Sequence, residues 1–335
     1  MDHHRNEDNS LLNFEQLPDL PADFYRAQCV WFGEELLICG GSHNNQCYSY
    51  HVSKRQYKEI CSYPKEVTLY GHTVIICARS ESKEKDRVTL LSFGGGPYGW
   101  SVPYHTMLMD YKSVWSKQKS KHKNKWVAFG NGTFFGENYD FGGARALVGG
   151  TDNALLFITR SPRYIEIVDL KTYKYIDNLK NNILPISKDN DVFYHCFIPL
   201  STHHFILISE NEIILIQFHQ STHAFEYHIL PTCPTLKFCR SFAYVYFNHQ
   251  IILFGGWDFN KSQCTDSIHI FHVKKKSWSQ CNFTLPFPIN GSAAVFNPFQ
   301  FAVHLIGGKN DDRENQSTHF FIPIKKIVWS YTTTI

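Results

Sequence analysis

Aromatic side chains in three loop-like segments are the residues of this sequence best suited to bind a partner. The segments are residues 96–105, 131–143 and 257–261. Their aromatic members include Tyr98, Trp100, Tyr104, Phe134, Phe135, Tyr139, Trp257 and Phe259. Large, rigid rings on the loops of a stable scaffold give contact area at a low entropic cost and concentrate binding energy. We therefore predict that these residues form a surface for a peptide or protein.

Residues with catalytic or metal-binding chemistry show no comparable pattern. The chain has 18 His and 10 Cys, but it contains no C-x-x-C pair and no H-E-x-x-H motif. It also lacks a G-x-S-x-G elbow and a phosphate-binding loop that ends in Lys-Ser or Lys-Thr. We expect no catalytic residue, no metal and no cofactor.

The composition narrows the class of protein further. With 33 Lys and Arg against 30 Asp and Glu, the net charge of +3 is small for a dedicated nucleic-acid binder. The polar start MDHHRNEDNS is not a signal peptide, and the apolar runs are far shorter than the roughly 20 residues that cross a bilayer. Four cysteines lie in apolar runs, as reduced thiols do: Cys29, Cys39, Cys77 and Cys196. These features predict a soluble cytoplasmic protein with no nucleic-acid partner and no membrane insertion.

The elements that must position the aromatic loops form a repeat. Four apolar runs end in glycine doublets: Gly40 and Gly41, Gly94 and Gly95, Gly255 and Gly256, Gly307 and Gly308. Two further runs, residues 154–160 and 204–210, have the same apolar pattern without the glycines. The period is about 50 residues, which is typical of a repeat protein.

Two more features recur in each unit. An apolar and an aromatic residue lie seven positions apart in five units: Tyr50 and Tyr57, Val168 and Tyr175, Phe218 and Phe225, Phe271 and Trp278, Ile322 and Trp329. In the second unit, Leu108 and Trp115 fit the spacing, and Trp126 is an alternative anchor. A short apolar stretch also precedes each doublet or its equivalent, so each unit predicts four short strands.

These features resemble the kelch repeat over nearly the whole chain. The resemblance implies an all-β fold, a six-bladed β-propeller of four-stranded antiparallel blades. It places the blades at residues 24–64, 70–130, 143–180, 192–231, 239–286 and 290–335. We expect a disordered tail over residues 1–12 and a single domain over residues 13–335. Residues 13–21 are expected to close the ring as the outer strand of the sixth blade; the alternative is residues 330–335.

The resemblance also implies a function, because kelch propellers commonly act as scaffolds or substrate receptors. We therefore expect a non-enzymatic interaction module; the alternative is a sugar-directed or metal-dependent enzyme that uses the central channel.

Asp191 and His195 match half of the metal motif of the kelch-type specifier proteins, but Ser187 stands where that motif has Glu. The lysine-rich residues 117–125 are interpreted as a solvated loop, and an acidic partner is the alternative.

Overall fold

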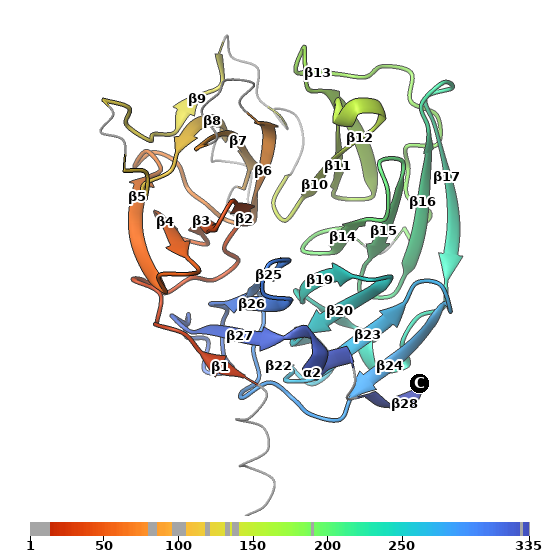
Figure 1. Ribbon diagram of the computed structural model, residues 1–335. Coiled ribbons are helices and arrows are strands. Elements are labelled where there is room, and N and C mark those ends of the chain that lie inside the picture. Colours follow the sequence, from red (N-terminus) through yellow and green to blue (C-terminus); the bar gives the residue numbers. More distant parts are fainter. Residues whose placement is uncertain are drawn as a thin grey trace, which may run out of the picture. The chain divides into compact units, whose positions relative to one another are not determined.

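The computed structural model describes residues 14–79, 86–95, 105–117, 121–130, 135, 141–188, 191–328 and 331–334. This part of the chain is built almost entirely of antiparallel strands in seven sheets. It divides into two compact units: unit 1 is Met1–Cys29 with Pro231–Ile335, and unit 2 is Val30–Leu230. Figure 1 colours unit 2 from orange to green and most of unit 1 in blue. No described helix is long and apolar enough to cross a membrane.

Unit 2 holds four sheets whose strands follow one another in sequence order. The first sheet consists of β2 (Cys29–Phe32), β3 (Glu35–Gly41), β4 (Asn44–His51) and β5 (Gln56–Ser62). The second consists of β6 (His72–Arg79), β7 (Arg87–Gly94), β8 (His105–Lys112) and β9 (Val127–Ala128). The third sheet consists of β10 (Arg145–Gly149), β11 (Leu155–Arg160), β12 (Tyr164–Asp169) and β13 (Lys174–Tyr175). The fourth consists of β14 (Cys196–Pro199), β15 (His204–Ile208), β16 (Ile213–His219) and β17 (Ala224–Leu230). A 3-10 turn, η2 (Thr151–Asn153), follows β10.

Unit 1 holds two larger sheets and one small sheet. One larger sheet has five strands: β19 (Ala243–Phe247), β20 (Gln250–Phe254), β23 (Ile268–His272), β24 (Ser277–Cys281) and β28 (Tyr331–Thr334). The other has four strands: β25 (Ala293–Asn297), β26 (Ala302–Ile306), β27 (His319–Pro323) and β1 (Glu15–Gln16). The small sheet is β18 (Cys239–Arg240), β21 (Trp257–Asp258) and β22 (Gln263–Cys264). Two short helices, η3 (Pro234–Leu236) and α2 (Ile324–Val328), complete the unit.

The apolar runs of the sequence form the second strand of their sheets. All residues of β3 and β11 are buried, because each of these strands is covered on both faces and between two hydrogen-bonded neighbours. The runs without glycines also become such strands, as β11 and β15 show. The prediction of an all-β fold with four-stranded antiparallel sheets is confirmed; among the described residues, β28 adds a fifth strand to one sheet, and the three-stranded sheet of β18, β21 and β22 was not predicted.

Antiparallel pairing gives each sheet two distinct ends. In the sheet of β19 and β20, the glycine doublet at the end of β20 marks one end, which we call the doublet end. The β19–β20 turn and the β23–β24 turn lie at the other end, the turn end, because Gln250 pairs with both Phe247 and His272. Loops are therefore sorted between the two ends by their place in the strand order.

The first glycine of a doublet adopts a backbone conformation and a close backbone contact that other residues avoid. Gly255 and Gly307 have φ of +60° and +55°, in the left-handed region that favours glycine. A Cβ on Gly255 would also clash with the carbonyl oxygen of Ile289, and one on Gly307 would clash with that of Phe24. Both clashes are with backbone, which cannot move aside as a flexible side chain can. The glycines therefore allow the backbone of another segment to pass close to each doublet, at Ile289 for Gly255 and at Phe24 for Gly307.

Gly255→Ala is expected to lower the free energy of unfolding by at least about 2 kcal/mol, because it adds backbone strain to a backbone clash. Gly130→Ala is the matched control, since a Cβ there meets no atom within 4 Å; it should stay within about 0.5 kcal/mol. Urea unfolding of both variants measures the difference. Equal stability of the two would show that the doublet is dispensable.

The aromatic anchors fall at the predicted strand pairs. Cross-strand partners are Tyr50 with Tyr57, Val168 with Tyr175, Phe218 with Phe225, and Phe271 with Trp278. In the second unit the anchor is Trp126, which is buried directly before β9, while Trp115 lies in a turn. Tyr175 differs from the others because 37% of it is exposed. Trp329 lies outside the described residues.

The N-terminal strand β1 pairs with β27, as predicted: Glu15 is the partner of Phe321, and Gln16 of Phe320. The alternative for the C-terminus is wrong, because β28 pairs with β24 in the other large sheet. The predicted tail, residues 1–12, lies outside the described residues.

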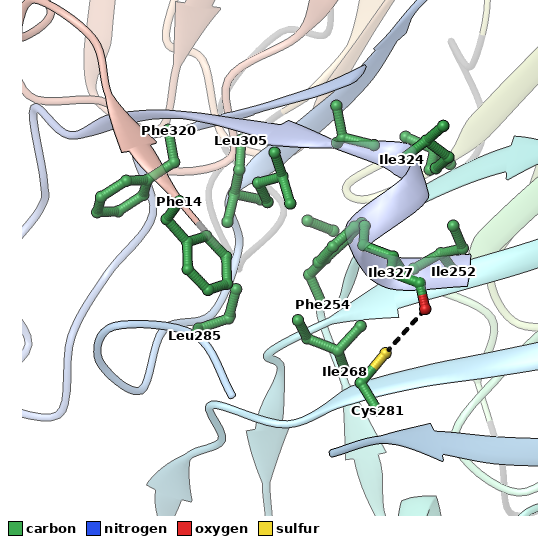
Figure 2. Packing of buried hydrophobic residues seen from close by; sticks show 14 of the residues in the cluster. Phe14, Ile252, Phe254, Ile268, Cys281, Leu285, Leu305, Phe320, Ile324 and Ile327 are labelled. Atoms are coloured by element: carbon green, nitrogen blue, oxygen red, sulfur yellow. Dashed lines mark hydrogen bonds between the residues drawn. The ribbon is translucent and has the colours of Figure 1, made fainter. Parts of the chain in front are cut away.

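The core of unit 1 contains side chains from both large sheets and from α2 (Figure 2). In this core the Cys281 thiol donates a hydrogen bond to the carbonyl oxygen of Ile327 at 3.8 Å.

Candidate functional site

The small sheet at the doublet end of unit 1 and its turn carry two of the three described aromatic residues of the predicted binding surface, Trp257 and Phe259. The doublet leads directly into β21, where Trp257 pairs with Arg240 of β18 and with Cys264 of β22. This pairing holds the backbone of the loop on both sides. Trp257 is therefore presented by a three-stranded sheet rather than by an irregular loop.

Three side chains of this sheet and its turn form a group that we call the aromatic–arginine cluster: Trp257, Phe259 and Arg240. The Trp257 and Phe259 rings meet edge to face, with centroids 6.5 Å apart. The guanidinium carbon of Arg240 lies 3.9 Å from the centroid of the Phe259 ring, a cation–π distance. Phe259 is 40% exposed. The cluster thus offers aromatic area and a positive charge to a partner.

The turn after Trp257 is held by a buried carboxylate. Asp258 accepts hydrogen bonds from the backbone N–H groups of Asn260 and Lys261 at 2.9 and 3.1 Å. Its second oxygen lies 3.4 Å from the Lys261 ammonium. An Asp side chain that caps its own turn in this way restricts the backbone. The position of Phe259 is therefore fixed before any partner binds.

A second group of cations and an aromatic ring lies beside this sheet. The side-chain cations of Arg26 and Lys309 both lie 4.6 Å from the Tyr25 ring centroid. The segment is joined to β22, because the Cys264 thiol donates to the carbonyl oxygen of Lys309 at 3.4 Å. Burial lowers the pKa of Lys309, and the positive charges of Arg26 and Arg313 lower it further. The doublet end of unit 1 therefore concentrates positive charge around the exposed Phe259 ring and the half-buried rings of Tyr25 and Trp257.

Comparison with known proteins identifies the repeat. A family model described as "Kelch motif" matches residues 239–282, the segment from β18 to the end of β24. Among solved structures, 557 chains match, and one of them is titled "Structure of YjhT". That protein is 13% identical, with a TM-score of 0.69 over 94% of this chain and 99% of that chain. The chain therefore has the fold of a β-propeller and carries a kelch motif over residues 239–282. No curated protein sequence matches this propeller.

The propeller places one predicted binding residue in its core. Phe135 is fully buried, its ring packs 5.6 Å from that of Phe93, and its N–H donates to the Thr106 hydroxyl at 2.9 Å. The prediction that Phe135 belongs to the binding surface is wrong, because β8 and the neighbouring strands enclose the ring. Five other predicted residues lie outside the described residues: Tyr98, Trp100, Tyr104, Phe134 and Tyr139.

Sequence reasoning missed the cations of this site. Arg26 and Arg240 occupy equivalent positions, each two residues after a phenylalanine and just before an inner strand: Phe24 precedes Arg26, and Phe238 precedes Arg240. This F-x-R pattern in two repeats of the propeller is the signal that would have found them. It is visible only once the start of each inner strand is known.

The buried polar groups of unit 2 have the geometry of catalytic pairs but no access to solvent. The Ser92 hydroxyl lies 2.8 Å from Nε2 of His105 and accepts a hydrogen bond from the Tyr63 hydroxyl at 2.9 Å. Burial lowers the pKa of His105 to about 3, and the nearby His72 adds to the shift. Ser92 is fully buried and His105 is 5% exposed. The pair therefore satisfies polar atoms in the propeller core.

No group of three or more His, Cys, Asp or Glu that could hold a metal ion occurs among the described residues. His195, which with Asp191 matches half of the specifier-protein metal motif, is buried, and its Nε2 lies 2.6 Å from the Thr159 hydroxyl. Burial lowers its pKa, and the positive charge of Arg145 lowers it further. The Nε2 atom of His195 therefore takes part in a hydrogen bond within the core.

The described part of the lysine-rich loop is anchored to the propeller. Asn124 accepts from the Lys112 N–H at 2.8 Å and donates to the Lys112 carbonyl oxygen at 2.9 Å. His122 lies 2.7 Å from the carbonyl oxygen of Asp110. Exposed lysines alternate with these anchors: Lys121, Lys123 and Lys125. The loop is solvated on one side, as expected, and is held by hydrogen bonds on the other.

Proposed function

We propose that this kelch propeller is a non-enzymatic, cytoplasmic interaction module that binds a peptide or protein at the doublet end of unit 1. The observation that carries the proposal is the aromatic–arginine cluster on a sheet whose turn is capped by Asp258. Trp and Arg are the residue types that most often dominate the affinity of an interface. A partner gains from such anchors because little entropy is lost when they are already ordered.

The chemistry of the cluster favours a partner with acidic and apolar groups. The guanidinium carbon of Arg240 lies 3.9 Å from the centroid of the Phe259 ring. Guanidinium groups bind carboxylates through charge-assisted, often bidentate hydrogen bonds. Arg26 and Lys309 extend the positive charge beside it. An acidic peptide with a large apolar side chain therefore complements this surface.

Affinity capture with the intact chain, followed by measurement of the captured partner, tests the proposal. Trp257→Ala is expected to weaken binding by about 2 kcal/mol, near thirtyfold, because it removes the largest ring of the cluster. Arg240→Lys should also weaken it, since lysine keeps the charge but loses the planar stack. Thermal unfolding of each variant checks that the fold is retained.

The matched control replaces the exposed lysines Lys121, Lys123 and Lys125 with Ser. These changes remove more positive charge than Arg240→Lys, but they leave the cluster intact. Partner binding should survive them. Binding that survives Trp257→Ala but fails in the lysine variant would move the recognition surface to the basic loop and refute the proposed site.

A further inference from the structure

The turn end of unit 1 carries a second apolar surface, which we call the phenylalanine knob: Phe247, Phe296, Phe299 and Phe301. Phe299 and Phe301 are 70% and 58% exposed and lie in the β25–β26 turn. Phe247 and Phe296 are half-buried, with ring centroids 4.8 Å apart. The Phe301 ring lies 6.3 Å from Phe247 and 6.4 Å from Phe296. Two exposed rings thus stand on or beside a base of two packed rings.

The tip of the knob is a well-defined turn. The Asn297 side-chain oxygen accepts hydrogen bonds from the N–H groups of Phe299 and Gln300 at 3.0 and 3.2 Å. Its amide nitrogen donates to the Gln300 side chain at 2.9 Å. An Asn that bonds the backbone two and three residues ahead fixes the turn. The exposed phenylalanines are therefore held outward by a rigid hairpin.

Folding alone does not explain the two exposed rings. Phe301 has a φ of +48°, a backbone conformation in which Asn or Gly is preferred and a bulky side chain is strained. An exposed apolar patch also costs solubility, and on a soluble protein it commonly marks an interaction site. Two exposed phenylalanines in one turn therefore indicate an interaction site.

Lysines surround the knob on two sides. Lys274, Lys275 and Lys276 are exposed in the β23–β24 turn, which is joined to the β19–β20 turn where the Val273 N–H donates to the His249 carbonyl oxygen at 2.9 Å. On the other side Lys325 and Lys326 are exposed on α2, which is joined to the knob where the Ile324 N–H donates to the Phe301 carbonyl oxygen at 2.9 Å. Residues 246–250, 272–277, 295–302 and 323–328 make up this surface and contain no Asp or Glu.

We propose that the phenylalanine knob and its five lysines bind the surface of an anionic membrane. Protruding apolar side chains enter the boundary between headgroups and acyl chains, and flanking lysines keep their ammonium groups among the anionic headgroups. The lysines lie on both sides of the rings, which suits an extended anionic plane better than a single acidic side chain. Binding of this kind needs no membrane-spanning segment.

This surface is separate from the one that carries the proposed function. Strand β20 starts at the β19–β20 turn, beside the knob, and ends at the doublet that leads to Trp257. The two surfaces therefore lie at opposite ends of the same strand. Changes in one are expected to leave the other intact, so the two proposals can fail independently.

Co-sedimentation of the intact chain with vesicles tests the proposal. Binding is expected with vesicles of phosphatidylcholine and phosphatidylserine, should weaken as salt is raised, and should be weak with phosphatidylcholine alone. Phe299→Ser is expected to reduce binding on the order of tenfold, because a ring no longer leaves water. Replacing the five lysines with Gln should remove the preference for phosphatidylserine, at roughly fivefold for each lysine.

Two controls make the test specific. Lys121→Gln with Lys123→Gln and Lys125→Gln removes charge from the basic loop of unit 2, and it should leave vesicle binding unchanged. Phe301→Asn should retain or raise the melting temperature while it weakens vesicle binding, because Asn tolerates the left-handed backbone. Loss of folding in Phe301→Asn would show that the ring is needed for folding, and it would refute the assignment of this ring to membrane binding.

Three results would overturn the proposal. The first is equal binding to vesicles with and without phosphatidylserine. The second is vesicle binding that Phe299→Ser and the five-lysine variant leave unchanged. The third is a polyglutamate peptide that binds the knob while vesicles do not, which would assign the surface to an acidic protein.

Discussion

Phe14→Ala is expected to lower the free energy of unfolding by about 3 kcal/mol or more, and deletion of residues 1–20 by a larger amount. Phe14 is 8% exposed, and its ring packs edge to face with Phe283 and Phe320 at 5.7 and 6.1 Å. Figure 2 shows Phe14 beside Leu285 and Phe320 in the core of unit 1. The deletion also removes the Leu17 N–H that donates to the His319 carbonyl oxygen at 2.8 Å.

Urea unfolding followed by tryptophan fluorescence measures this loss. Glu15→Ala is the control, because Glu15 is the exposed residue next to Phe14, at the start of β1; its effect should stay within about 0.5 kcal/mol. The m-value of the deletion variant should stay close to that of the intact chain if only stability changes. An unchanged midpoint for the deletion would mean that β1 contributes nothing to the stability of unit 1.

Acidification from pH 6.5 to pH 4 is expected to unfold the protein. Burial lowers the pKa of His72, His269 and His304 to about 4 and that of His105 to about 3. In the unfolded chain these histidines titrate near pH 6.5, so between pH 6.5 and 4 the unfolded state binds more protons. The free energy of unfolding therefore falls as the pH falls through this window. Each of these groups contributes about 3 kcal/mol across this window, so the four together are comparable to a typical stability of about 5–15 kcal/mol.

The urea midpoint measured at intervals between pH 7.5 and pH 4.5 tests this expectation. In His105→Gln, the midpoint should change less steeply with pH, because one group that binds a proton only on unfolding has been removed. His223→Asn is the control: His223 is exposed, and Asn tolerates its φ of +50°. A midpoint that stays constant down to pH 4.5 would contradict the buried, neutral state of these histidines.

The repeat could be predicted from the sequence because its signals are local. A doublet such as Gly255 and Gly256 reports a backbone conformation that other residues avoid, whatever surrounds it. The pair of Phe271 and Trp278 reports a hairpin, because seven positions are spanned by two strands and one turn. Where the spacing was ambiguous, between Trp115 and Trp126, an insertion had lengthened the hairpin, and only the strand pairing decided the anchor.

The binding surface could be predicted only in part. Trp257 and Phe259 were identified because they follow a doublet, but Arg240 is distant from them in sequence and joins them through the β18–β21 pairing. Phe135 has the same sequence context as a surface aromatic residue and is nevertheless in the core. Phe299 and Phe301 were not identified, because a short hairpin with two phenylalanines has the pattern of a buried strand.

The sequence by itself determined the strand order, the positions of the glycine turns and the kelch character of this protein, since these depend on residues close together in the chain. Tertiary structure alone decided which rings are exposed, which cation lies on which ring, and that the C-terminal strand β28 joins β24. Those features depend on neighbours supplied by distant segments, as Phe14 meets Phe320 and Arg240 meets Phe259. Burial is a property of the assembled sheets, and no single segment carries it.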